Sequence, residues 1–345
     1  MSTLTRGPAL PAPAGRPRNR RGSRPAGLRL RGPAWLVRRQ HRAAFWTLIA
    51  LTLLAVTVMV LLRGQMMDYL TTQDPTARKA GSPPPGFEPY ADRIFAAGSY
   101  LGYVPVLVGV LLGAPLIAGD LESGTAALVT SQSVSRRRWI TMKLALPAAL
   151  VALSTAVLSG VLSWWWSPVK GLSAGLTWTS FFSVTGPVPV AYALLTFTVG
   201  AAAGLLLRRT LVSMVVTLGV VVAISLVWDR FWRNLGHVLT ISTGKGVGPG
   251  AVRPELPAQA EQQGQGTYFL TSSGDRLGWT TCLDRAENLQ AHTACLESKH
   301  VIGWSLDYLP VSQMQTMQWL GAGIMLALTA AVAAFVIARG HKRLL

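Results

Sequence analysis

The 345-residue chain has few charged residues, and acidic side chains are the scarcer kind. Only 13% of its residues are charged, with 14 Asp and Glu against 32 Lys and Arg, whereas soluble domains average about 25% charged residues. Half of the residues are hydrophobic, and they gather in runs of roughly 20, which is the length of helix that crosses a ~30 Å hydrocarbon layer. This composition excludes an ordinary soluble domain and predicts an all-α polytopic membrane protein.

We expect six transmembrane helices. Within their predicted limits, none contains Asp, Glu, Lys, Arg or His. Because ionisable residues inside a membrane mark proton relays and ion paths, their absence argues against a proton-driven carrier. It also argues against an aspartyl or zinc-dependent membrane protease, which needs paired acids or an HExxH helix. The expected helices are approximately residues 43–62, 98–119, 144–164, 186–207, 211–228 and 319–338.

The sequence also lacks the phosphate-binding pattern GxxxxGK[ST]. Its nearest string, residues 242–246, has the wrong spacing, so this chain is not expected to bind ATP through that motif. We predict no catalytic residues and no cofactor. We also predict no metal site, because His292 and His300 do not stand at a zinc-ligand spacing from the two cysteines. If the chain moves cargo uphill, the energy comes from another protein.

The net charge of +18 belongs almost entirely to one predicted face of the membrane. Twenty of the 32 basic residues, but only Asp120 and Glu122 of the 14 acidic residues, fall on that face. Cytoplasmic loops carry such an excess, so we predict a multi-pass plasma membrane protein with both termini in the cytoplasm and no nucleic-acid partner. The basic residues stand in four segments, residues 6–42, 136–143, 208–209 and 339–343.

Four regions follow from this topology. Residues 1–34 form a basic tail that is too poor in large apolar residues to fold; it acts as a topology signal or binds anionic lipids. Residues 35–228 comprise a short interfacial helix, up to Phe45, and the first five transmembrane helices. Residues 229–318 form a large extracytoplasmic loop, and residues 319–345 the last helix and a basic cytoplasmic end.

Both cysteines, Cys282 and Cys295, lie in the predicted extracytoplasmic loop. Cysteine pairs outside the cytoplasm tend to oxidise, and closing a loop of this size stabilises the fold by about 3 kcal/mol. We predict a disulfide between them, the alternative being two free thiols. At the other conspicuous cluster, residues 164–166, three tryptophans end a helix, which favours an aromatic belt at the membrane interface over ligand stacking.

The segment from Ala114 to Lys143 contains acidic, basic and hydroxyl side chains and a glycine, which is more than a simple connection between two helices requires. Ser123 and Gly124 can end the second helix, because glycine adopts turn conformations at little cost. Thr125 can cap a short helix over residues 126–129 with a small apolar face, and Ser133 or Ser135 can cap the next helix. We interpret this segment as a cytoplasmic loop that receives force from a partner. The candidate residues are Asp120, Glu122, Gly124, Thr125, Leu128, Ser135, Arg136 and Lys143.

Two of these predictions have alternatives. The arginines at 136–138 belong to the docking surface, or they serve only topology and headgroup contact. Glu122 accepts hydrogen bonds from backbone N–H groups of the loop, pairs with those arginines, or is a solvated acid. Because Asp120 and Glu122 are the only acids on a basic face, we expect each of them to have a partner.

This segment, residues 113–143, resembles the loop between the second and third helices of ABC transporter permeases of the export-type (type 2) family. In that family a Glu-x-Gly-Thr element, a stretch ending in Ser-Arg and a lysine recur in this order. Two further strings, Arg39–Arg42 and Val184–Ala193 with its closing Arg208–Thr210, resemble actinobacterial members. The matching loop elements here are Glu122–Thr125, Val134–Arg136 and Lys143.

The resemblance implies a permease subunit, paired as a homodimer or heterodimer and driven by a separate ABC ATPase subunit. The loop is then a coupling helix seated in a groove of the ATPase. The chain departs from its relatives at Gly119, where they often carry an arginine, so the charge pairing near it is expected to differ. The alternative function is a non-transporting membrane anchor or sensor whose external loop binds a ligand, and a neighbouring gene for an ATPase would separate the two.

Overall fold

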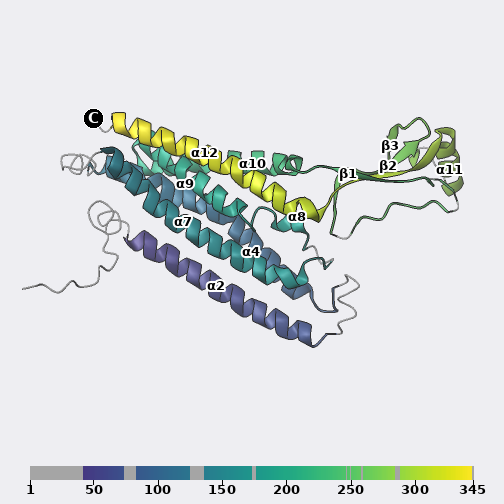
Figure 1. Cartoon of the computed structure of the whole chain (residues 1–345), viewed down its shortest axis with the longest axis horizontal. Helices are drawn as coiled ribbons and strands as arrows, with labels where there is room; N and C mark the ends of the chain where they lie inside the picture. Colours follow the sequence, from purple (N-terminus) through teal and green to yellow (C-terminus); the bar gives the residue numbers. More distant parts are fainter. Residues whose placement is uncertain are drawn as a thin grey trace, which may run out of the picture.

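The computed structural model describes residues 42–73, 83–124, 136–172, 176–245, 247–248, 250–257, 259–283 and 288–343. The basic tail and most of the expected interfacial helix lie outside these residues. Within them, six helices are long and apolar enough to cross a membrane, which confirms the predicted all-α membrane part. Figure 1 shows these helices as one elongated bundle, with a small sheet beyond one of its ends.

Five of the six crossings run further than their apolar cores suggested, whereas α9 starts two residues later than predicted. The second crossing is a single helical run of three parts, α4, η1 and α5, in which η1 is a π-helix. Short helices, α8 (Trp178–Phe181) and η3 (Trp232–Leu235), lie near the sheet end. The main elements are α2 (Arg42–Thr71), α4 (Glu88–Leu107), η1 (Val108–Gly113), α5 (Ala114–Glu122), α7 (Arg136–Trp166), α9 (Val188–Leu207), α10 (Thr210–Phe231) and α12 (Met314–Arg343).

Helix α9 is the central element of the bundle, and small residues allow its backbone to touch that of η1. A Cβ atom added to Gly200 would lie 2.3 Å from the carbonyl oxygen of Gly109, and one added to Gly113 would lie 2.4 Å from that of Phe197. The Thr196 hydroxyl donates to the Pro105 carbonyl, 2.6 Å away. Small residues permit this close approach between membrane helices, where the hydrophobic effect contributes little to association.

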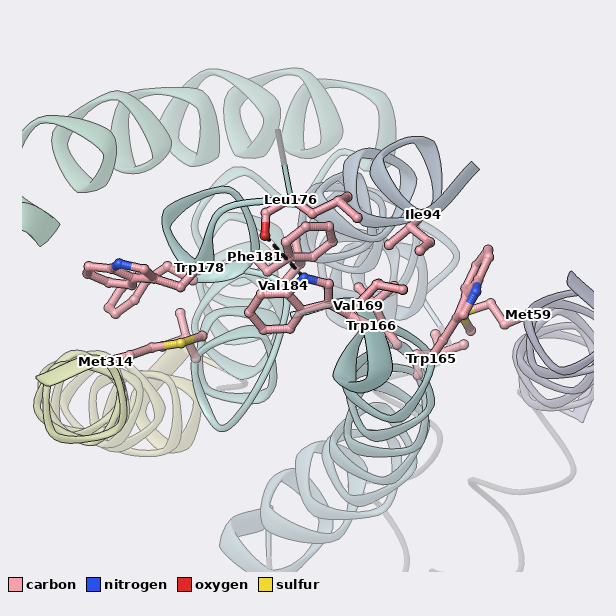
Figure 2. Packing of buried hydrophobic residues seen from close by; sticks show 14 of the residues in the cluster. Met59, Ile94, Trp165, Trp166, Val169, Leu176, Trp178, Phe181, Val184 and Met314 are labelled. Carbon is pink, nitrogen blue, oxygen red and sulfur yellow. Dashed lines mark hydrogen bonds between the residues drawn. The ribbon is translucent and has the colours of Figure 1, made fainter. Parts of the chain in front are cut away.

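The tryptophans at 164–166 do not form a uniform interfacial belt. Trp164 is 46% exposed. The guanidinium of Arg63 lies over its indole, 3.7 Å from the ring centroid. Trp165 and Trp166 are buried in the main hydrophobic cluster, where the Trp166 indole donates to the Leu176 carbonyl and its ring stacks on Phe181 (Figure 2). The prediction of an interfacial cluster is therefore wrong for these two side chains, because the helix turns them inward.

Between α10 and α12 the chain forms a sheet that the sequence analysis did not anticipate. Its four strands are antiparallel in the order β1-β4-β2-β3, and a helix, α11 (Leu289–Ser298), packs beside them. The structure joins Cys282 to Cys295, which lies on α11, in a disulfide. The strands are β1 (Leu239–Thr243), β2 (Glu261–Thr271), β3 (Arg276–Gly278) and β4 (Val301–Leu309). We call residues 239–309 the sheet region.

Candidate coupling site

The two ends of the loop interpreted as a coupling element lie at the end of the bundle away from the sheet region. Figure 1 shows the start of α7 and the last turns of α12 together at this end. A Cβ atom on Gly340 of α12 would lie 2.7 Å from the side chain of Ile140 on α7. Helix α5 ends at Glu122, and Gly124 follows it with φ +69°, so the Ser-Gly pair ends the helix as predicted.

Asp120 and Lys143 form a salt bridge between α5 and α7. Both side chains are buried, with 1% of Lys143 and 8% of Asp120 exposed, and these are the only buried charged residues among the described ones. The ammonium of Lys143 also lies 4.9 Å from the ring centroid of Trp139. Each charge therefore has a direct partner, which is the condition under which a buried ion can be tolerated.

This pair corrects the expectation that ionisable residues stay outside the transmembrane helices. The predicted helices stop at residue 119 and start again at residue 144, one residue short of each charge. The observed helices run to Glu122 and begin at Arg136, so both charges lie within helices and inside the bundle. Apolar runs locate the middle of a membrane helix. They do not show that the helix continues past a charged residue whose partner lies on a neighbouring helix.

Glu122 binds a backbone group that none of the sequence interpretations proposed. Its carboxylate accepts a hydrogen bond from the N–H of Thr210, at 2.8 Å. Thr210 is the first residue of α10, so the acid caps the positive end of a helix dipole and satisfies one of its free N–H groups. The carboxylate is exposed and the contact joins the end of α5 to the start of α10.

Thr210 is presented to Glu122 by a tight turn between α9 and α10. Arg208 adopts the left-handed conformation, with φ +57°, and donates its N–H to the Gly204 carbonyl at 3.1 Å. Gly204 itself packs against α5, since a Cβ there would lie 2.5 Å from the carbonyl oxygen of Ala114. The close packing of α9 on α5 therefore places the turn, and the turn places Thr210.

The structure thus brings four of the eight candidate residues to one end of the bundle in defined positions, Asp120, Glu122, Gly124 and Lys143. Thr125, Leu128 and Ser135 lie outside the described residues, and of Arg136 only the backbone is described, as the first residue of α7. Sequence reasoning missed Trp139 and Thr210. Thr210 had a visible signal, because it follows a two-residue basic turn and is therefore the first residue of a helix.

The family model described as "ABC-2 membrane transporter related" matches residues 49–233, which is more than half of the chain. The matched segment runs from α2 through α10 and includes both contacts of the candidate coupling site, while the sheet region and α12 follow it. A search of curated proteins finds no match.

Proposed function

The chain belongs to the ABC-2 membrane transporter related family, and from this premise we propose that it is the permease of an exporter driven by a separate ABC ATPase. Membership makes it a multi-pass transport subunit rather than a catalytic one. The proposal adds that the ATPase docks on residues 119–143. It also adds that the end of the bundle bearing this loop faces the cytoplasm, as the basic residues indicate.

The observation that carries the proposal is the pair of contacts at the ends of the loop. Asp120 and Lys143 lock α5 to α7 on the two sides of the loop, so force applied to the loop moves both helices together. Glu122 links the same end of α5 to α10. A docked ATPase would therefore act on three transmembrane helices at once, which a loop free of such contacts could not do.

The partners follow from the same proposal. As the family resemblance implies, the permease pairs with a second permease, either a copy of itself or a related chain. The flank of the bundle leaves helix surface for such a partner, since only 6% of the apolar window of α2 and 17% of that of α10 are buried. The proposal also includes binding of anionic lipids by the basic residues of the tail, each of which contributes about 1 kcal/mol of attraction when it is near such a leaflet. The sensor function is the second candidate, and it would need no ATPase.

The test uses Glu122→Ala in membranes that contain the chain and an ATPase encoded beside it. The substitution removes an exposed contact at a loop end and leaves the buried pair intact, so we expect normal insertion and normal co-purification of the ATPase. Stimulation of ATP hydrolysis by the permease should fall several-fold, because α10 no longer follows α5. The matched control is Asp68→Ala, which removes an exposed acid from α2.

Wild-type stimulation in Glu122→Ala would show that this contact plays no part in coupling. Failure of the wild-type chain to retain any ATPase, in membranes where both proteins are present, would favour the sensor function. Equal losses in Glu122→Ala and Asp68→Ala would mean that removing an acid disturbs the bundle in general, and they would also contradict a specific role for Glu122.

A further inference from the structure

A cleft of about 350 Å³ lies in the sheet region, at the far end of the molecule from the coupling site. Its size falls within the range of small-molecule sites, roughly 300–1,000 Å³. The lining comes from β2, β4, α11 and the segments around residues 253 and 279–283. The lining residues are Arg253, Gln262, Thr267, Phe269, Trp279, Leu283, His292 and Trp304.

Two buried nitrogen atoms of the lining residues have no hydrogen-bond partner among the described residues. They are Nε1 of Trp304 and Nε2 of His292, and the Trp304 side chain is only 8% exposed. An indole N–H can only donate, and leaving such a group buried without an acceptor costs about 1–3 kcal/mol. A ligand with acceptor oxygens in the cleft would remove this cost once the side chains around the two buried nitrogens shift and open them to the cleft.

Aromatic rings supply the apolar part of the cleft. Phe269 and Trp304 are opposite each other on β2 and β4, with ring centroids 4.3 Å apart, so they pack as one buried surface. Trp279 is 50% exposed and offers a free ring at the opening. A tryptophan offers a large flat apolar face with a polar N–H at its edge, which suits contact with an amphipathic ligand.

One cationic side chain and several polar groups lie beside these rings. Arg253 is exposed, and its guanidinium lies 5.0 Å from the ring centroid of Trp304. Gln262 and Thr267 lie on either side of an irregularity in β2, where the pairing with β4 shifts register; such bulges re-aim side chains and are common beside binding sites. None of the described residues that line the cleft is acidic.

We propose that this cleft binds a sugar ring, with preference for a sugar that carries a carboxylate. A pyranose ring has an apolar C–H face that fits against Trp279, and hydroxyl oxygens at its rim that accept from Trp304 and Arg253. A carboxylate on the ring adds a charged acceptor for Arg253. The disulfide between Cys282 and Cys295 holds the wall, because Leu283 follows one cysteine and His292 lies one helical turn before the other.

The experiment is calorimetric titration of the full chain in lipid nanodiscs with two matched disaccharides, cellobiose and cellobiouronic acid, which differ by one carboxylate. We expect both to bind, the acid about two- to fivefold more tightly, as an exposed charge pair contributes. Trp279→Ala should weaken both by at least about tenfold, as the loss of an aromatic anchor does. Trp304→Phe keeps a ring, removes the donor and should weaken both by about three- to tenfold.

Two controls make the result specific. Leu289→Ala changes an 80% exposed residue of α11 that does not line the cleft, and it should bind as the wild type does. Arg253→Gln should abolish the preference for the acid but keep binding of cellobiose.

Three outcomes would overturn the proposal. They are no heat from either disaccharide at about 10 mM, unchanged binding in Trp279→Ala, or equal binding of cyclohexanecarboxylate, which has an apolar ring and a carboxylate but no hydroxyl groups. None of these measurements involves an ATPase, so the sugar site and the coupling role stand or fall separately.

Discussion

The middle of the bundle and the sheet region are held together by different means. In the bundle, Gly200 and Gly113 let α9 and η1 meet backbone to backbone, and one ion pair is buried where α5 meets α7. In the sheet region, five buried residues form the core, Phe269 and Trp304 among them, and a third, Cys282, belongs to a disulfide.

The difference follows from the surroundings that each part is built for. Within a membrane, apolar side chains gain little by leaving lipid, so packing distance and satisfied polar groups hold helices together. A region as small as residues 239–309 has little core to bury, and small cores depend on covalent links. Substitutions should therefore be most damaging where backbones touch in the bundle, and a lost disulfide should damage the sheet region alone.

The largest effect is expected for Gly200→Leu. A side chain at this position would collide with backbone atoms of Gly109 and Ala114, at 2.3 and 2.8 Å from a Cβ, and backbone atoms have no room to move aside. We expect little or no folded protein in detergent, measured as the monodisperse fraction in size-exclusion chromatography of a fluorescent fusion. Gly219→Leu on α10, where nothing lies within 4 Å of a Cβ, should give wild-type yield. Equal yields from the two would contradict the central position of α9.

The next effect is expected for Asp120→Ala, which leaves the Lys143 ammonium buried without its acid. Breaking a buried pair in this way costs on the order of 3–5 kcal/mol, so the melting temperature of the purified chain should fall by several degrees. The double variant Asp120→Leu with Lys143→Met replaces both charges by apolar groups and should recover most of the loss. If the double variant melts below Asp120→Ala, the pair is not an isolated electrostatic contact, and our account of its stability is wrong.

The smallest effect is expected for replacing Cys282 and Cys295 together by serine. The loss of the bridge should destabilise the sheet region by about 3 kcal/mol and leave the bundle unchanged. Limited proteolysis should then cut between residues 239 and 309 faster, while the transmembrane fragments keep their wild-type lifetime. In the wild type, neither thiol should react with an alkylating reagent until a reductant is added. Free thiols in membranes prepared without reductant would refute the bridge in the cell.

The sequence determined the number of membrane-crossing helices and the point at which α5 ends. Runs of apolar residues give six crossings, because a helix satisfies its own backbone hydrogen bonds in lipid. Gly124, with a positive φ, follows the end of α5, where the sequence predicted that the helix stops. The loop motif also identified the family, which the family model that matches residues 49–233 confirms. These properties depend on composition and local conformation, so they can be read along the chain.

The tertiary structure alone decided which side chains meet. Glu122 and Thr210 are 88 positions apart, and Asp120 pairs with Lys143 across the loop, so neither contact follows from local spacing. Packing also set the rotation of α7, which turns Trp165 and Trp166 inward and leaves Trp164 outside. The physical reason is the same in each case: hydropathy sets how far a helix reaches, whereas the close fit against α9 sets its rotation and register, and therefore its partners.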